Sequence, residues 1–227
     1  MIKMEINYDL IHSNRKTIGI TVERDKNIVI RAPKEASQEE IDDFIKRKKY
    51  WIYTKLKHPQ KYKKNTKKEF VSGASILYLG KHYKLDIVKE DLEGIKFLNK
   101  FMISKNNQEN ARDLFKQWYI SKAKEKIIPK VQEFAEKLGV NCNSINIKEF
   151  TYRWGSCTPN NNINFNWRLI KAPTSVIDYV VVHELAHLLE PNHSNKFWSI
   201  VKTQIPKYKD AKEWLKTNGQ LLESDFN

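Results

Sequence analysis

Four residues in the last third of the chain carry groups that can do chemistry together. Residues 183–193 read His-Glu-Leu-Ala-His-Leu-Leu-Glu-Pro-Asn-His. His183 and His187 are four positions apart, so a helix places both imidazoles on one face, where they can hold a single metal ion. Glu184 follows the first ligand and can take a proton from a water molecule beside that ion and pass it to a leaving group. The pattern predicts a hydrolytic metal site with Glu184 as the catalytic base.

A third ligand is expected because catalytic zinc is held by three protein groups and keeps one position for water. His193 lies six residues beyond His187, across a break at residues 191–192 that ends the helix and turns the chain back. We expect His183, His187 and His193 to bind the metal. A downstream acidic residue such as Glu213 is the alternative third ligand and ranks below His193. Zinc is the expected ion, although three imidazoles also accept cobalt or nickel.

The competing interpretation is a set of unrelated histidines on an apolar helix. A His-Glu-x-x-His match arises by chance in roughly one chain of this size in a hundred. Residues 180–182 and 188–189 around the motif are all aliphatic. Polar groups in such surroundings are costly to bury unless a partner satisfies them. Metal binding is therefore the stronger interpretation.

The spacing of the three histidines matches the metzincin pattern, but two other features of that pattern are missing. The pattern has Gly where this chain has Glu190, and it continues to a Met-turn. All three methionines, Met1, Met4 and Met102, precede the motif. A Met-turn is impossible here, so a true metzincin is not expected.

The N-terminal part is expected to be mainly antiparallel β structure with one helix. Apolar and polar residues alternate in residues 4–32 around a turn-like segment at 24–27, as in a hairpin. Ser37 and Glu40 match a capping box, and the helix that they begin is expected to run to about Leu56. A Lys-rich connector is expected next, followed by short strands at residues 75–79, 81–88 and 95–103.

The C-terminal part is expected to alternate helix and strand around the histidine motif. An apolar stripe predicts a long helix over residues 107–138, with Gly139 as its stop. Residues 145–170 have a strand pattern that is broken by a turn-rich segment at 155–162. The fold class is therefore predicted to be α+β. We expect an N-terminal region at residues 1–106 and a zincin-like catalytic domain at residues 107–227.

The composition indicates a cytoplasmic protein with a basic surface. The formal net charge is +14, and the two cysteines, Cys142 and Cys157, form no Cys-x-x-Cys pair. No signal peptide and no apolar stretch of membrane-spanning length is expected. A nucleic-acid partner is possible because basic surfaces attract polyanions. Only seven of the 41 basic residues are Arg, whereas recognition of phosphates and bases favours the Arg fork.

Several motifs together resemble the YgjP-like metal-dependent hydrolases, also called YgjP-like metallopeptidases. The resemblance is carried by the segments 152–157 (Tyr-Arg-Trp-Gly-Ser-Cys), 163–169, 172–173, 177–187 and 192–194, followed by Phe197-Trp198, and it extends to residues 73–80 near the front. The resemblance implies that the three histidines bind zinc and that Glu184 is catalytic. This family is also similar to the SprT-like and Wss-type proteases, some of which act on DNA-bound proteins.

The sequence therefore predicts a zinc-dependent hydrolase, and more narrowly a metallopeptidase that cleaves peptide bonds. The alternative is a nucleic-acid-associated module with a structural zinc, or a protease guided to DNA by the basic surface. Glu184 separates these classes, because a closed structural site uses a fourth protein ligand and has no need of a base. Asp178 and the Glu190 carboxylate are candidates for orienting the imidazoles. Gly155 is expected to be a turn residue, and Tyr208 an ordinary surface residue.

Overall fold

The chain folds into two compact units in a computed structural model that describes residues 6–23, 26–57, 69–151 and 153–223. The units comprise Met1–Lys64 and Asn65–Asn227, and each has its own hydrophobic core. The expected boundary at residues 106/107 differs from this division. Ile76, Leu85 and Phe101 belong to the same core as the helices that follow them. The strands around residues 75–104 are therefore part of the larger unit.

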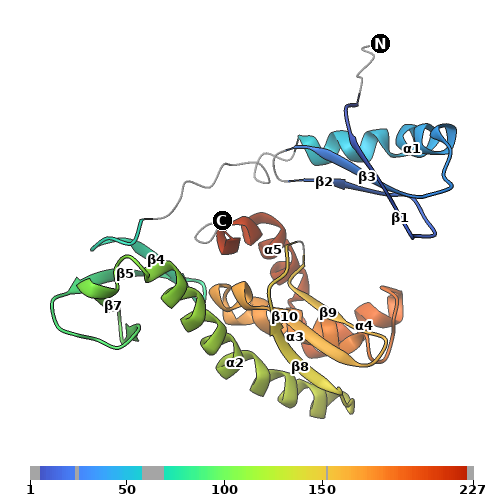
Figure 1. Cartoon of the computed structure of the whole chain (residues 1–227). Helices are drawn as coiled ribbons and strands as arrows, with labels where there is room; N and C mark the ends of the chain where they lie inside the picture. The colour runs from blue at the N-terminus through green and yellow to red at the C-terminus, as the bar shows by residue number, and fades with distance from the viewer. Residues whose placement is uncertain (1–5, 24–25, 58–68, 152, 224–227) are drawn as a thin grey trace. The chain divides into compact units, whose positions relative to one another are not determined.

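The N-terminal unit is a three-stranded sheet with one helix. Its elements are β1 (Asp9–Ser13), β2 (Gly19–Val22), β3 (Ile28–Pro33) and α1 (Gln38–Leu56) (Figure 1). The predicted hairpin is confirmed in the antiparallel β2–β3 pair. The expectation of an antiparallel sheet is wrong for β1, which pairs with β3 in parallel. The reason is that β3 inserts between β1 and β2.

Helix α1 begins as the sequence predicts. The Ser37 side chain accepts a hydrogen bond from the Glu40 N–H, and the Glu40 carboxylate accepts one from the Ser37 N–H at 2.9 Å. Ile41 and Ile52 are the buried residues of this helix, and they pack in the core of the N-terminal unit with the strand residues of β3. Most of the connector expected after Leu56 lies outside the described residues.

The larger unit begins with a four-stranded sheet in the order β4-β5-β7-β6. The strands are β4 (Ser75–Tyr78), β5 (Lys81–Val88), β6 (Lys96–Phe97) and β7 (Phe101–Ser104). The segment expected as one strand at residues 95–103 is therefore a short antiparallel pair, β6–β7. Strands β5 and β7 are parallel, so this sheet is mixed as well.

This sheet is tied by its backbone to the segment that leads into the histidine helix. The Leu79 N–H donates to the Ile170 carbonyl at 3.1 Å, and the Gly80 N–H donates to the Lys171 carbonyl at 2.8 Å. Gly80 has a φ of +77°, and an added Cβ would lie 2.9 Å from the Pro173 Cα. A glycine is required at this turn for both reasons. The β4–β5 turn therefore holds the start of the histidine helix in place.

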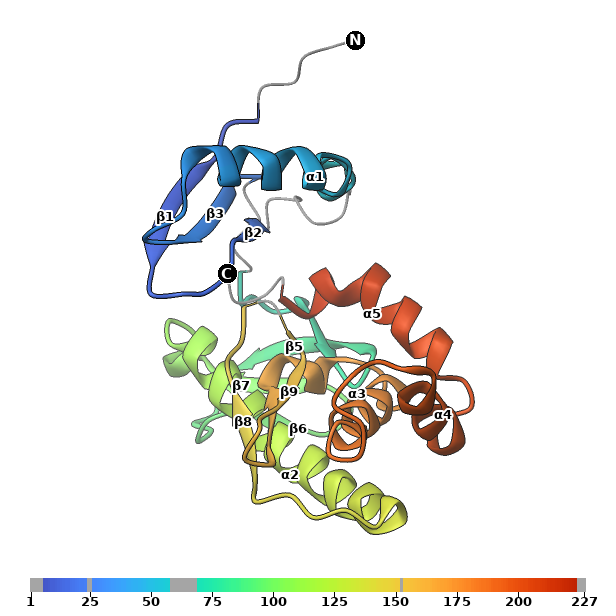
Figure 2. The ribbon, with the colours of Figure 1, turned by 90° about the vertical axis from the view of Figure 1, so that its right-hand side faces the viewer.

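The long helix α2 (Ala111–Leu138) spans the larger unit and forms one wall of its core (Figures 1 and 2). Pro129 lies inside it, and Gly139 ends it in the left-handed conformation with φ 65°. The predicted stop is thus confirmed. Tyr119 is fully buried on this helix and its hydroxyl donates to the Leu77 carbonyl at 2.6 Å.

A second sheet has the order β8-β10-β9. Its strands are β8 (Ser144–Lys148), β9 (Gly155–Cys157) and β10 (Asn162–Asn166), and the 3-10 helix η2 (Trp167–Lys171) follows. Strand β10 pairs in parallel with β8 and antiparallel with β9. Both of its edges are occupied, so β10 is a core strand. Strand β9 is the edge strand of this sheet next to the histidine helix.

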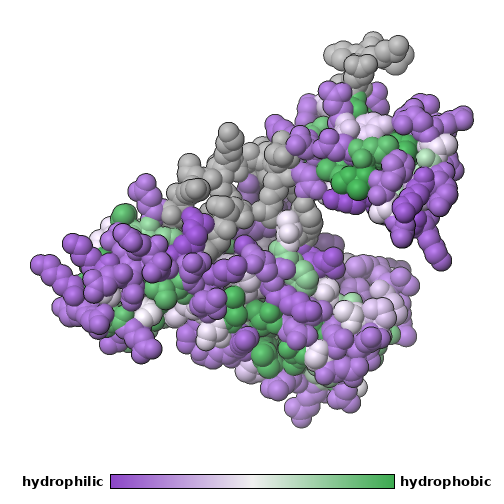
Figure 3. Space-filling view, viewed as in Figure 1, coloured by the Kyte–Doolittle hydropathy of each residue, from purple (hydrophilic) through white to green (hydrophobic). Residues whose placement is uncertain are grey.

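Three helices complete the larger unit: α3 (Thr174–Ala186), α4 (Asn195–Gln204) and α5 (Tyr208–Glu223). Helix α3 carries the histidine motif and contacts α2, α4, α5 and β9. Nine of its thirteen residues are buried. Among the described residues, no helix is long and apolar enough to cross a membrane. The visible faces of both units are mostly hydrophilic (Figure 3).

Candidate metal centre

The three predicted histidines come together at the end of α3. His183 lies in the last turn of α3 and His187 caps its C-terminus. His193 comes just before Ser194, whose side chain caps α4 by accepting a hydrogen bond from the Phe197 N–H. The α4 cap thus fixes the point at which the chain returns to the metal side of α3.

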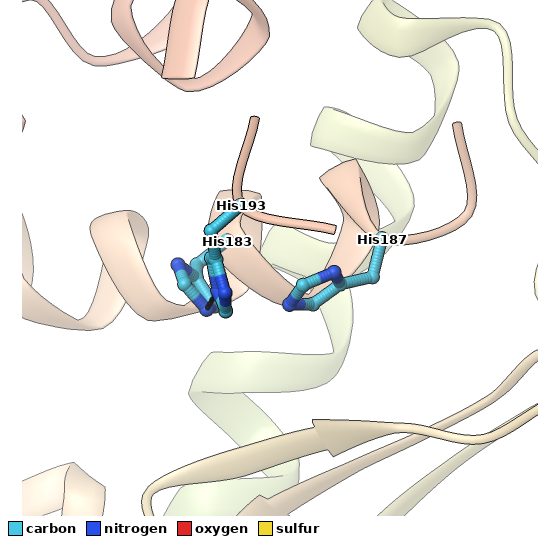
Figure 4. Close-up of side chains that lie close together, drawn as sticks. All are labelled: His183, His187 and His193. Atoms are coloured by element: carbon cyan, nitrogen blue, oxygen red, sulfur yellow. Dashed lines mark hydrogen bonds between the residues drawn. The ribbon is translucent and has the colours of Figure 1, made fainter. Parts of the chain in front are cut away.

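The imidazole rings face one another (Figure 4). One ring nitrogen from each histidine lies within 4.8 Å of the other two. The Nε2 atoms of His183 and His193 are 3.1 Å apart. Two nitrogens at about 2.1 Å from one tetrahedral zinc ion would be about 3.4 Å apart, so this spacing suits a shared ion. Among the described residues this group contains three histidines and no fourth ligand.

Aromatic rings hold the imidazoles in place. Phe197 is fully buried, and its ring centroid lies 5.0 Å from that of His183 and 4.7 Å from those of His187 and His193. Trp198 stacks on His193 at 5.6 Å. Phe197 and Trp198 therefore pack beside the end of α3. Contacts on several sides reduce the rotamer freedom that the imidazoles would lose on binding an ion.

The surroundings of His183 and His193 favour the neutral form of the imidazole, which is the form that binds metals. The pKa of His183 is lowered to about 3, mainly by burial and then by the neighbouring His187 and His193. Burial and His187 also lower the pKa of His193. A neutral imidazole has a free lone pair for a metal ion. Three imidazole nitrogens within reach of one another fit zinc or a similar transition metal.

Glu184 lies beside this group, on the wall of an open cleft. The cleft has a volume of about 640 Å³ and is lined by β9, the loop after it and the end of α3. Glu184 is only 6% exposed. Burial raises its pKa to about 7, whereas a hydrogen bond from the Cys157 backbone N–H and the positive charge of Arg153 act in the opposite direction. A carboxylate with a pKa in this range is suited to take up and release a proton near neutral pH.

The sequence profile of the family described as "YgjP-like, metallopeptidase domain" matches residues 16–218. The chain belongs to the YgjP-like metallopeptidase family. The protein is therefore a metal-dependent peptidase, and membership implies a divalent metal ion and peptide or protein substrates. A comparison with curated proteins found no match.

Two solved structures resemble part of this YgjP-like chain. The metallopeptidase zymogen of Pyrococcus abyssi abylysin is 19% identical, with a TM-score of 0.39, over 44% of this chain and 99% of that chain. The metallopeptidase zymogen of Methanocaldococcus jannaschii jannalysin is 23% identical, with a TM-score of 0.37, over 42% of this chain and 96% of that chain.

The acidic residues considered as partners of the imidazoles in this YgjP-like protein have other roles. His187 Nδ1 lies 3.3 Å from the backbone carbonyl of Glu190, so it is this carbonyl and not the carboxylate that contacts the ring. Asp178 pairs with Lys130 at 2.6 Å. Glu213, the alternative third ligand, pairs with Lys216 at 3.1 Å and is outside the histidine group.

Sequence reasoning missed two features that contact the Glu184 carboxylate. One is the backbone N–H of Cys157, and the other is the bare Cα of Gly155. Every residue except proline has a backbone N–H, so the residue type at position 157 does not reveal this donor. The Gly155 contact depends on how β9 packs against α3. The glycine in the segment 152–157 is the available signal, although the sequence alone predicts a turn residue there.

Proposed function

We propose that this YgjP-like protein is a zinc peptidase in which His183, His187 and His193 hold the metal and Glu184 is the general base. The observation that carries the proposal is the placement of a nearly buried carboxylate next to three converging imidazoles, on the wall of a cleft. Three protein ligands beside a cleft leave room for water and substrate, as catalytic zinc requires.

The residues divide the work as follows. Zinc, when bound, supplies Lewis acidity that polarises the scissile carbonyl and makes a water molecule easier to deprotonate. Glu184 takes the proton from that water as the new C–O bond forms. The same carboxyl then gives the proton to the amine nitrogen as the C–N bond breaks. Burial excludes bulk water from the carboxylate, which strengthens its interaction with the proton that it transfers.

The test combines metal analysis and peptide hydrolysis on the same purified samples. Wild type and Glu184→Gln are expected to contain one zinc per chain, and His187→Ala is expected to contain none. Hydrolysis should fall at least about 100-fold in both variants, because Glu184→Gln removes the acid-base group and His187→Ala removes the metal. His82→Ala removes an exposed histidine on β5 and should leave metal and activity unchanged. The absence of bound metal in zinc-supplemented wild type would reject the proposal.

A second candidate function, association with nucleic acid, is supported by one surface in the N-terminal unit. Tyr50 is 80% exposed on α1, and Trp51 and Tyr53 are both 37% exposed. Lys57 Nζ lies 4.5 Å from the centre of the Tyr53 ring. Exposed rings among cations provide stacking and charge neutralisation for a single strand. The basic residues in this part of the chain, at 46–57, are Lys46, Arg47, Lys48, Lys49, Lys55 and Lys57.

This candidate is tested by fluorescence anisotropy with labelled single-stranded DNA over a range of salt concentrations. Affinity should fall steeply with salt, because phosphate contacts release counterions. Lys46→Glu/Arg47→Glu should weaken binding, while Lys81→Glu/Lys84→Glu, with the same charge change on β5, should not. A lack of binding at low salt would exclude this function and leave the peptidase proposal intact.

A further inference from the structure

Strand β9 passes directly beside the side chain of Glu184. The backbones of Trp154 and Thr158 form hydrogen bonds with β10. The Asn166 N–H donates to the Trp154 carbonyl at 2.8 Å, and the Thr158 N–H donates to the Asn162 carbonyl at 3.0 Å. Because backbone groups alternate sides along an antiparallel strand, Gly155 and Cys157 direct theirs away from β10. That side faces α3, and the Cys157 N–H donates a hydrogen bond to the Glu184 carboxylate.

Gly155 is in closer contact with Glu184 than any other residue type would allow. A Cβ added to Gly155 would lie 2.6 Å from Glu184 Oε1, 2.7 Å from Cγ and 2.8 Å from Cδ. All three distances are too short for non-bonded atoms. The carboxylate therefore occupies the space that a side chain at position 155 would fill.

The backbone itself does not require glycine at position 155. The glycines with positive φ among the described residues are Gly73, Gly80, Gly94 and Gly139, and Gly155 is not one of them. Any residue can adopt its backbone conformation. The expectation that Gly155 serves a turn is therefore wrong, because it lies in strand β9 and the contact that excludes a side chain is with Glu184.

We propose that Gly155 and the Cys157 N–H form a backbone seat that sets the position of the Glu184 carboxylate. Gly155 is then a positioning residue, and the inference rests on the proposed role of Glu184 as the base. The long Glu side chain rotates about three bonds, so its anchor on α3 alone does not fix its tip. In this seat the Cys157 N–H donates a hydrogen bond to the carboxylate, and the backbone of Gly155 limits how closely the carboxylate can approach β9.

Gly155→Ala is the direct test, because the atoms in the way belong to the end of a flexible side chain. The fold can accept the methyl group if Glu184 moves, and the carboxylate then leaves its seat. A displacement of the carboxylate by about 1 Å should lower kcat about 10- to 100-fold. KM and zinc content should stay within about twofold of wild type, since neither the histidines nor the open part of the cleft changes.

A matched control is Gly219→Ala in α5. Its added Cβ would lie 3.2 Å from the Trp154 ring and touches no part of Glu184. This variant should keep the wild-type kcat. If both variants lose activity equally, the effect is general crowding near β9 and the inference is overturned.

A second readout needs neither metal nor activity. In metal-free protein, the Cys157 amide proton should exchange slowly with solvent, because Glu184 accepts its hydrogen bond. Gly155→Ala should speed this exchange. Glu184→Ala should speed it as well, and Gly155→Ala should add nothing in the Glu184→Ala background, because the two changes break the same contact.

The outcomes separate this inference from the proposed function. An active wild type together with a Gly155→Ala variant of unchanged kcat and unchanged Cys157 exchange overturns the seat and leaves the peptidase standing. A large fall in Tm, a loss of zinc or a rise in KM alone also overturns it, because Gly155 would then serve the fold, the metal or the substrate. An inactive wild type rejects the peptidase, and the exchange experiment still decides whether the seat exists.

Discussion

Helices α1 and α3 place polar residues in opposite environments. Only two of the nineteen residues of α1 are buried, and its charged residues are solvated. Nine of the thirteen residues of α3 are buried, Glu184 among them. Water satisfies the polar groups of α1 from any direction, whereas those of α3 depend on partners that other elements bring to them.

The difference between α1 and α3 shows that reactive side chains keep a fixed geometry only where other elements pack against them. On α3, β9 fixes the Glu184 carboxylate, and Phe197 of α4 packs on the imidazoles. On α1, an exposed side chain such as Tyr50 can take many rotamers at little cost in free energy. The proposed catalytic group therefore lies on the buried helix, while the exposed helix offers at most a surface for association.

The largest expected effect is a truncation on the buried helix. Leu185 is fully buried on α3, so Leu185→Ala should lower the free energy of unfolding of the larger unit by about 2–5 kcal/mol. Tyr50→Ala on α1 should change the stability of the smaller unit by no more than about 0.5 kcal/mol. Urea denaturation followed by Trp fluorescence measures both. Similar losses for the two variants would contradict the comparison.

Zinc should stabilise only the unit that contains α3. At a free concentration 100-fold above its dissociation constant, a ligand stabilises the folded state by about 2.7 kcal/mol. Calorimetry should show a higher Tm for the larger unit and an unchanged transition for the smaller one. His193→Ala should abolish the shift, and Glu213→Gln, the alternative ligand, should keep it. The reverse result would identify Glu213 as the third ligand.

A smaller effect is expected at the two helix starts. Ser37→Ala removes the side-chain cap of α1 and should destabilise the smaller unit by about 1 kcal/mol. Helix α3 has no such cap, because Pro173 occupies the cap position before Thr174 and makes no side-chain cap bond. Thr174→Ala should therefore change stability by less than about 0.5 kcal/mol. Thermal denaturation by circular dichroism distinguishes the two.

The smallest expected effect is the pH dependence of the stability that Glu149 contributes through its ion pairs with Lys116 and Arg168. The hydrogen bond from Lys116 lowers the pKa of Glu149 below 4.5, Arg168 lowers it further, and partial burial opposes both. The ionised Glu149 therefore stabilises the fold above about pH 4.5, and this contribution is lost as the pH falls through the lowered pKa of Glu149. Because Glu149 is 49% exposed, Glu149→Gln should remove less than about 1 kcal/mol at neutral pH.

The control for this effect is an exposed pair on α1. Lys46 and Asp43 are 3.1 Å apart, with side chains 77% and 59% exposed. Solvent screening leaves such pairs with little contribution to the free energy of unfolding, so Asp43→Asn should change it by a few tenths of a kcal/mol at most. A loss equal to that of Glu149→Gln would show that burial of Arg168 adds nothing to the pair.

Much of the secondary structure follows from local sequence. The Ser37–Glu40 capping box begins α1, and Gly139 ends α2 in the left-handed conformation. These features depend on residues a few positions apart, so their chemistry is visible in the chain itself. The strand pairings were less accessible. The parallel β1–β3 and β5–β7 pairs join segments that are not consecutive, and local periodicity carries no information about which strands pair.

The sequence by itself determined the convergence of His183 and His187, because a spacing of four on a helix puts them one turn apart. It also indicated His193, since the break after His187 returns the chain within a few residues. Only the tertiary structure decided the unit boundary and the contact of Gly155 and Cys157 with Glu184. Those depend on the packing of segments far apart in the chain, and a bare Cα or a backbone N–H is recognised only when its neighbour is in place.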